Sequence, residues 1–193
     1  MLNLDPLAPD RIRPLQRVEY ERIVEVGLFE GERVELLRGA LVSMGPQGAG
    51  HAEVVTRLTE ALVVALRGRA RVRTQCPFAA SDDSEPEPDV AVVPVADHSR
   101  AHPAAAHLVV EVAQTSLRKD RLIKAGIYAA NGVPEYWVVD LEGRRIEVHT
   151  EPADGRYREV VAQACGCAIA LTAFPDVRVT VDAVLPAVAT PEE

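Results

Sequence analysis

The sequence predicts an α/β (α+β) protein, in which a mixed β-sheet is flanked by helices and carries additional antiparallel hairpins. Two short apolar runs, in EPEPDVAVVP at 85–94 and HLVVEVAQTS at 107–116, are typical of strands that are buried on both faces. A helical segment at 117–131 follows and leads into a third apolar strand, EYWVVD at 135–140. A strand, a helix and a strand joined by short loops favour a parallel pair with a right-handed crossover. The other strands are expected to pair antiparallel, so the predicted sheet is mixed.

The clearest helix in the sequence follows the loop GPQGAG at 45–50. Val55, Leu58, Leu62 and Leu66 recur at helical spacing, so one face of this helix is apolar. The segment after it alternates in polarity, which indicates a half-buried strand. Two elements are expected before this helix: a helix at 15–29 that ends near Gly27, and a hairpin at 33–44 with its turn near Gly39. The clearest helix itself covers 51–67, and the half-buried strand after it covers 70–78.

The helix at 117–131 is predicted to have one polar and one apolar side. Asp120, Lys124 and Tyr128 follow one another at intervals of four residues and therefore share a face. Asn131-Gly132 supplies the C-terminal cap. The opposite side carries the apolar residues Leu122, Ile123, Ile127 and Ala130.

Strand patterns continue to the end of the predicted domain. A turn at Glu142-Gly143 reverses the chain after EYWVVD. The expected strands are RRIEVHT and then two or three more in REVVAQ, AIAL and VRVTVDAVL.

The length of 193 residues suits one domain, which we place at 15–185. The proline-rich segment 1–14 and the tail 186–193 are expected to be poorly ordered. No apolar run approaches the roughly 18 residues of a membrane span, and the N-terminus lacks the pattern of a signal peptide. We therefore expect a cytoplasmic protein that does not associate with membranes.

The three cysteines predict neither a disulfide framework nor a zinc site. An odd, low count without a secretion signal argues against disulfides. Cys165 and Cys167 have the wrong spacing for half of a zinc site, and no second pair completes it. Together with Cys76 they are expected to be structural thiols.

The net charge of −8 is unfavourable for binding nucleic acid, because phosphate backbones are bound by Lys and Arg. Positive charge is nevertheless concentrated locally. Four arginines lie in RGRARVR at 67–73, and a second cluster comprises Arg118, Lys119, Arg121 and Lys124. These runs either steer nucleic acid along a basic groove or are solvated faces, and the sequence leaves both alternatives open.

Two carboxylates and a lysine form the strongest candidate for a site. Asp89 begins one buried strand and Glu111 lies inside the next, and a buried carboxylate is costly unless it is paired or binds a metal. If the two strands are neighbours, the two carboxylates approach one point. Together with waters and the backbone carbonyl of Val112, these carboxylate oxygens would suit a hard cation such as Mg²⁺. Lys124 can lean toward them from the following helix, where it would orient a water or offset charge on a phosphoryl oxygen. The alternative to a site is that Asp89 caps its strand, Glu111 forms an ion pair and Lys124 lies on a solvated face of the helix.

Other polar clusters fit a site less well. The loop at 45–50 lacks the lysine and the spacing of a phosphate-binding loop. His98, His102 and His107 match no zinc spacing and are expected to lie in a surface loop. The acidic run at 82–87 is expected to be a solvated loop.

Several segments, taken in order, resemble the Uma-two family of endonucleases, which belongs to the restriction-endonuclease-like PD-(D/E)XK superfamily. The resemblance covers roughly residues 15–185 and implies a restriction-endonuclease-like mixed sheet flanked by helices. The resembling segments are PDVAVV, LVVEV, the helix that contains Lys124, GVPEYWVVD, the hairpin VELLRGALV and the helix HAEVVTRLTEAL.

The resemblance implies a role for five residues. Asp89 and Glu111 would be the metal ligands, and Lys124 would be the catalytic lysine, displaced from the strand to the following helix. Glu35 corresponds to the family's hairpin glutamate, which would extend the acidic cluster or hydrogen-bond a metal-bound water. His51 corresponds to the histidine at the start of the first helix, where it would contact substrate phosphate or cap the helix.

Two segments depart from the family's pattern. After the Glu-Val strand this chain has Ala113-Gln114-Thr115-Ser116 where the family usually has Ser-Pro-Ser. Ala113 stands two residues after Glu111, at the position from which the resemblance implies that the lysine has migrated, so only Lys124 can fill that role. In the hairpin turn, Arg38 and Ala40 replace the acidic residues that usually flank the glycine. Asp89, Glu111 and Lys124 therefore match the family's pattern, whereas the segments around them are less typical of it.

The leading hypothesis is a Mg²⁺- or Mn²⁺-dependent endonuclease that hydrolyses phosphodiester bonds in nucleic acid, with DNA as the expected substrate. The second is a catalytically inactive nuclease-fold module for dimerisation or for binding nucleic acid or protein, suggested by the net charge of −8 and the altered segment after Glu111. A third is hydrolysis of a small phosphoester. A homodimer is expected by analogy with nuclease folds, since cutting both strands of a duplex needs two sites.

Overall fold

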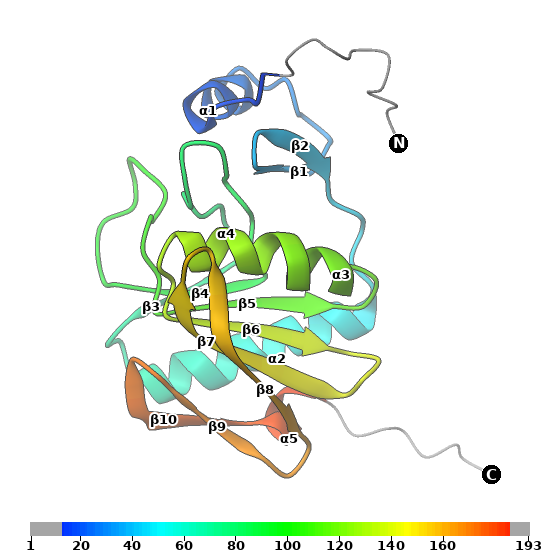
Figure 1. Ribbon diagram of the computed structural model, residues 1–193, viewed down its shortest axis with the longest axis vertical. Coiled ribbons are helices and arrows are strands. Elements are labelled where there is room, and N and C mark those ends of the chain that lie inside the picture. Colours follow the sequence, from blue (N-terminus) through cyan, green and yellow to red (C-terminus); the bar gives the residue numbers. More distant parts are fainter. Residues whose placement is uncertain (1–12, 186–193) are drawn as a thin grey trace, which may run out of the picture.

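The computed structural model describes residues 13–185, in which a six-stranded mixed sheet carries helices on both faces (Figure 1). This architecture confirms the predicted fold class. The strands lie in the order β3-β4-β5-β6-β7-β8. Their bounds are β3 Arg71–Thr74, β4 Val90–Val93, β5 Leu108–Ala113, β6 Glu135–Asp140, β7 Arg145–Ala153 and β8 Arg156–Ala164.

Further elements surround this sheet. Helix α1 and a two-stranded hairpin precede it, and a second hairpin and a short helix follow it (Figure 1). The bounds are α1 Arg17–Glu25, β1 Val34–Leu37, β2 Ala40–Ser43, α2 Ala49–Leu66, α3 Leu117–Lys119, α4 Ala125–Ala130, β9 Ala168–Leu171, β10 Phe174–Thr180 and α5 Val181–Val184.

The predicted parallel pair is present at the centre of the sheet. Strands β5 and β6 are parallel, with Val109 opposite Tyr136, and the helical segment α3–α4 crosses between them. The neighbouring pairs β4–β5 and β6–β7 are antiparallel. The central strands β5 and β6 are buried along their whole length, as their continuous apolar sequences predict.

Alternate residues of the central strands pack on two different cores. Leu108, Val110 and Val112 of β5 face α2, where the β9–β10 hairpin and α5 complete one core. Val109 and Ala113 face α4 in the second core. Glu111 lies between these two residues and therefore points to the α4 side of the sheet.

Helix α2 owes its position to its apolar stripe. The predicted residues Val55, Leu58, Leu62 and Leu66 are all buried against the sheet. Truncating a buried leucine of this kind to alanine costs about 2–5 kcal/mol. The helix begins at Ala49, slightly earlier than expected, so the loop before it is shorter than predicted.

The helical segment α3–α4 is packed on the sheet by its polar side. Asp120, Lys124 and Tyr128 are buried, whereas Leu122 on the predicted apolar side is 63% exposed and Ile123 is 39% exposed. The shared face of the three polar residues is confirmed, but the sheet covers this face rather than the apolar side. A buried ionic face of this kind requires partners from other segments.

The β1–β2 hairpin is closed by Arg38 and Gly39, which both have positive φ, at 51° and 76°. Two central residues with positive φ define the turn that matches the twist of a hairpin. A Cβ on Gly39 would also lie 2.1 Å from the Cβ of Pro14. Glycine is therefore required here for both backbone conformation and space.

Gly39→Ala is expected to destabilise the protein by about 1–3 kcal/mol, because it combines a strained backbone with a steric clash. Thermal melts of wild type and variant measure the loss. Gly31→Ala is the matched control, since Gly31 also has a positive φ, of 85°, but nothing lies near its would-be Cβ. An equal loss of thermal stability in both variants would show that the close approach of Pro14 to Gly39 adds nothing to the destabilisation.

The acidic run at 82–87 is not the solvated loop that its composition predicts. Ser84 and Glu85 are buried. The backbone of Glu85 forms a bridge with Leu36 of β1, and the Ser84 hydroxyl accepts the amide of Arg38. The prediction is wrong because this run packs against the β1–β2 hairpin, which covers it.

Smaller differences concern the chain ends and the cysteines. The last predicted strand stops at Thr180, whose hydroxyl accepts the Ala183 amide and begins α5. Cys76, Cys165 and Cys167 are free thiols, the last two exposed. Of the two segments predicted to be poorly ordered, residues 1–12 and 186–193 lie outside the described residues. Between residues 13 and 185, every helix is too short or too polar to cross a membrane.

Candidate active site

Asp89 and Glu111 line one cavity beside the start of β4. The antiparallel register pairs Val90 with Val110, and Asp89 and Glu111 are the residues next to this pair on the two chain segments. Both side chains are buried. The strands are therefore neighbours, as the prediction of a shared site required, and cross-strand partners lie close together.

Asp89 is held by the start of α2 and by β5. Its Oδ2 atom accepts the backbone N–H of Val112 at 2.8 Å and lies 3.1 Å from Nε2 of His51. His51 lies in the first turn of α2. Val112, which lines the same cavity, donates its amide to Asp89, and the role of its carbonyl as a metal ligand stays a prediction.

Glu111 accepts two hydrogen bonds from the helical segment above it. Nζ of Lys124 lies 2.9 Å and the hydroxyl of Tyr128 lies 2.8 Å from the same oxygen, Oε1. Burial raises the pKa of Glu111 well above its usual range, although Lys124 opposes this effect. The anionic form of Glu111 is thus disfavoured unless further positive charge is present.

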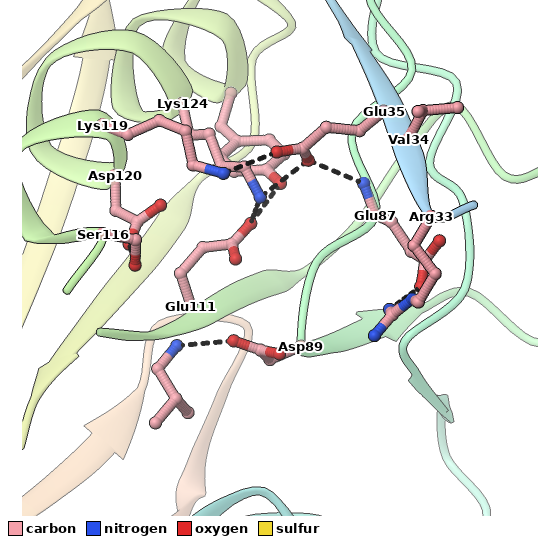
Figure 2. Close-up of polar contacts among 12 residues, drawn as sticks. Arg33, Val34, Glu35, Glu87, Asp89, Glu111, Ser116, Lys119, Asp120 and Lys124 are labelled. Atoms are coloured by element: carbon pink, nitrogen blue, oxygen red, sulfur yellow. Dashed lines mark hydrogen bonds and ion pairs between the residues drawn. The ribbon is translucent and has the colours of Figure 1, made fainter. Parts of the chain in front are cut away.

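Glu35 reaches this cluster from β1. Its carboxylate is fully buried and accepts Lys119 Nζ at 2.8 Å and Lys124 Nζ at 2.9 Å (Figure 2). Burial alone would raise the pKa of Glu35, but Lys124 and Lys119 together lower it. Lys124 therefore lies between two carboxylates, Glu35 and Glu111. Although burial opposes its charge, these acids raise the pKa of Lys124, so it is a cation at neutral pH.

A π-helical turn at Asp120–Lys124 separates α3 from α4. Such turns hold one residue more than an α-helical turn, and they often occur at functional sites. Lys119 and Lys124, five positions apart, consequently reach the two oxygens of one carboxylate. Asp120 is also buried here and accepts the Ser116 hydroxyl at 2.5 Å.

The sequence prediction missed Lys119 and Ser116 as members of this cluster. Lys119 was assigned only to a basic run, and Ser116 was seen only as a departure from a family pattern. Helical spacing did place Asp120 and Tyr128 on the face of Lys124. No local signal marked Lys119, because the π-helical turn that redirects it does not follow from an α-helical period.

These residues surround a cavity of about 150 Å³. Asp89, Glu111, Asp120 and Lys124 are the buried charged residues of its lining, and Glu35 contacts Lys124. The remaining lining comes from Arg33 before β1, from residues 44–48 and His51 around the start of α2, from Glu87, and from Val112, residues 114–116 and Lys119.

The charges and atoms of this cluster fit a divalent cation. Four carboxylates, Glu35, Asp89, Glu111 and Asp120, adjoin only two lysine ammonium groups. With all four ionised the cluster would lack two positive charges, a state that burial disfavours by raising the pKa of Glu111 and Asp120 and that a divalent cation would balance. Its donors are oxygens, which Mg²⁺ prefers. Within residues 13–185, no three side chains of His, Cys, Asp or Glu form a ready metal site. Any bound Mg²⁺ would therefore also need waters or substrate oxygens, as it commonly does.

The two basic runs occupy different surroundings. Arg121 forms ion pairs with Glu147 at 2.5 Å and Asp140 at 3.4 Å. Arg69, beyond the C-terminal end of α2, pairs with Asp176. An 18-residue helix is about 27 Å long, so Arg69 is far from His51 at the other end. Only Lys119 and Lys124 of the two runs contact the cluster directly.

Comparison with known proteins agrees with this arrangement. The model of the Uma2 family, described as “Putative restriction endonuclease”, matches residues 17–182. The chain belongs to this family. The match includes every residue of the cluster, from Glu35 to Tyr128, and confirms the resemblance predicted from the sequence.

A solved structure supports the fold of this Uma2-family protein. It is the crystal structure of a “putative nuclease belonging to DUF820” from Anabaena variabilis ATCC 29413. The two chains are 14% identical and superpose with a TM-score of 0.67, over 89% of this chain and 97% of the other. At this identity the likeness shows the fold alone. No protein of curated function matches the chain.

Proposed function

We propose that this protein is a Mg²⁺-dependent endonuclease that hydrolyses phosphodiester bonds of nucleic acid, with DNA as the first substrate to test. The supporting observation is the meeting of Asp89, Glu111 and Lys124 in one cavity. They come from two neighbouring strands and a crossover helix. Membership of a family described as putative restriction endonucleases supports the same reaction class.

Each residue has a part that follows from its contacts. Asp89 and Glu111 would hold Mg²⁺, which when bound would polarise the phosphoryl oxygen and lower the pKa of an attacking water. His51 and the Val112 amide fix the orientation of Asp89. Lys124 keeps its positive charge beside Glu111, where it would position the water and offset negative charge on the phosphate.

Glu35 would act mainly by holding the lysines. Both of its oxygens are occupied by Lys119 and Lys124, so it is less suited to be a metal ligand than Asp89. Lys119 at the cavity wall would contribute local positive charge on an otherwise acidic protein, whereas Arg33 at the same wall is paired with Glu87. We also propose that the protein acts as a homodimer when it cuts duplex DNA, because each protomer offers one such site.

The proposal predicts that Mn²⁺ binds wild type and that Asp89→Ala abolishes binding. Isothermal titration of Mn²⁺ into wild type and into Asp89→Ala measures binding, and cleavage of labelled DNA in Mg²⁺ measures activity in parallel. Asp89→Ala, Glu111→Ala and Lys124→Ala should each lower cleavage by at least about a hundredfold. Asp82→Ala, at an exposed acidic position outside the cavity, is the control and should behave as wild type.

The outcomes separate the competing functions. Cleavage retained in all three variants would overturn the assignment of the site. Faster hydrolysis of small phosphodiesters than of DNA would favour a small phosphoester as substrate. Absence of both Mn²⁺ binding and cleavage in wild type would favour the non-catalytic module, which the net charge of −8 and the altered segment at 113–116 suggested.

A further inference from the structure

The two oxygens of Glu111 have different surroundings. Within residues 13–185, the hydrogen bonds that Glu111 accepts both end on Oε1, from Lys124 at 2.9 Å and Tyr128 at 2.8 Å. A carboxylate oxygen has two lone-pair directions, so these two donors saturate Oε1. The other oxygen, Oε2, is the one left for a ligand in the cavity that Glu111 lines.

Tyr128 holds this arrangement from a place that substrate cannot reach. Its side chain is fully buried, and the cavity wall does not include it. The ring packs 5.1 Å from the ring of Tyr136 and 6.1 Å from that of Phe78, which fixes the hydroxyl. Tyr128 can therefore act on chemistry only through Glu111.

The hydroxyl of Tyr128 is a dependable donor. A phenol carries a single O–H, and that of Tyr128 is directed at Oε1 of Glu111. The Lys124 ammonium has three donors and is shared with Glu35, whereas the phenol offers one hydrogen bond in one direction, which sets the rotation of the carboxylate.

We propose that Tyr128 is a positioning residue for metal binding. By occupying Oε1 of Glu111, it turns Oε2 into the cavity and makes Glu111 a ligand through a single oxygen. This inference rests on the proposed function, since it assumes that the cation binds at Asp89 and Glu111. Partners of metal ligands commonly contribute ten- to a hundredfold in metal affinity.

Tyr128→Phe should weaken Mn²⁺ binding about tenfold, because Glu111 can then rotate and lose its single orientation. The ring and its packing remain in place. Isothermal titration gives the dissociation constant, and the electron paramagnetic resonance spectrum of bound Mn²⁺ reports the change in ligand geometry. Neither readout depends on cleavage.

Tyr157→Phe is the matched control. Tyr157 is likewise buried, and its hydroxyl donates to the Val133 carbonyl at 2.9 Å, so its removal deletes a similar hydrogen bond away from the cavity. Both variants should lose similar thermal stability. Only Tyr128→Phe should change the Mn²⁺ dissociation constant and spectrum.

The outcomes distinguish this inference from the function on which it rests. If wild type binds Mn²⁺, Asp89→Ala does not, and Tyr128→Phe binds as wild type does, the site is upheld and the role of Tyr128 is overturned. An equal loss of affinity in Tyr157→Phe would also overturn it, since the effect would then be structural. If wild type binds no Mn²⁺, the metal site and the role of Tyr128 fall together.

Discussion

Lys124→Met is expected to lower the free energy of unfolding by about 3–5 kcal/mol at pH 7 and to abolish cleavage. Lys124 is 2% exposed and lies 2.9 Å from both Glu35 and Glu111. Methionine fills much of the same space but leaves two buried carboxylates without their shared cation. Such a loss is a large fraction of the 5–15 kcal/mol that stabilises a typical domain. Urea unfolding of the metal-free protein measures it.

Lys119→Met is the control for this prediction. Lys119 contacts the same carboxylate, Glu35, but its side chain is 28% exposed and Lys124 would remain as a partner. A loss of about 1 kcal/mol is expected. Equal losses in the two variants would contradict the view that burial of Lys124 between two acids makes it the critical cation.

The defect in Lys124→Met should become smaller as the pH falls. Lys124 lowers the pKa of both Glu35 and Glu111, so its removal raises both values in the folded protein. The folded variant then binds protons more readily than the unfolded chain, and its stability relative to wild type increases toward acid. Unfolding measured at pH 8, 7, 6 and 5 tests this direction. A defect that does not change with pH would show that the carboxylates stay ionised or become solvated.

Glu111→Gln is expected to have opposite effects on activity and stability. Cleavage should fall by more than about a hundredfold, since loss of a metal ligand should exceed the loss of a ligand's partner. The metal-free protein should become more stable at pH 8, because burial raises the pKa of Glu111 and disfavours its charged form. Glutamine keeps an oxygen for Lys124 and Tyr128 without a buried charge. Thermal melts in a chelator measure the change, at about 2–4 °C for each kcal/mol.

The stability difference between Glu111→Gln and wild type should depend on pH and metal. Because the folded-state pKa of Glu111 is raised, wild type loses the contribution of this group as the pH rises above its usual value near 4.5, whereas glutamine does not titrate. The variant's advantage should therefore be larger at pH 8 than at pH 5. Added Mn²⁺ should reduce it by stabilising wild type alone. A variant less stable than wild type at pH 8 without metal would contradict this account.

Most of the fold was predictable because its central strands carry strong local signals. Strand β5 begins and ends within the predicted apolar run, and β6 coincides with EYWVVD. The helix between them made the parallel pairing predictable, since a crossover of this kind has few alternatives. The order of Asp89, Glu111 and Lys124 along these elements was likewise visible in the sequence. In the structure Lys124 contacts Glu111, and β4, which follows Asp89, pairs with the strand of Glu111.

The prediction was weaker where burial depends on distant segments. The run at 82–87 has the composition of a solvated loop, yet the β1–β2 hairpin covers Ser84 and Glu85. The two basic runs suggested a groove for nucleic acid, yet Arg69 and Arg121 pair with acids elsewhere in the chain. Composition describes a segment by itself, whereas the cost of burying a charge is decided by the partner that meets it.

The sequence by itself determined the strands, the crossover helix and the acids and lysine that they carry, because hydrophobic periodicity is a local property of the chain. Only the tertiary structure decided that the polar side of α3–α4 faces the sheet while Leu122 is exposed. It also decided that Glu35, from a separate hairpin, holds both Lys119 and Lys124. The physical reason is that a buried ion requires a counter-ion within about 4 Å, and that partner comes from whichever segment the fold brings there.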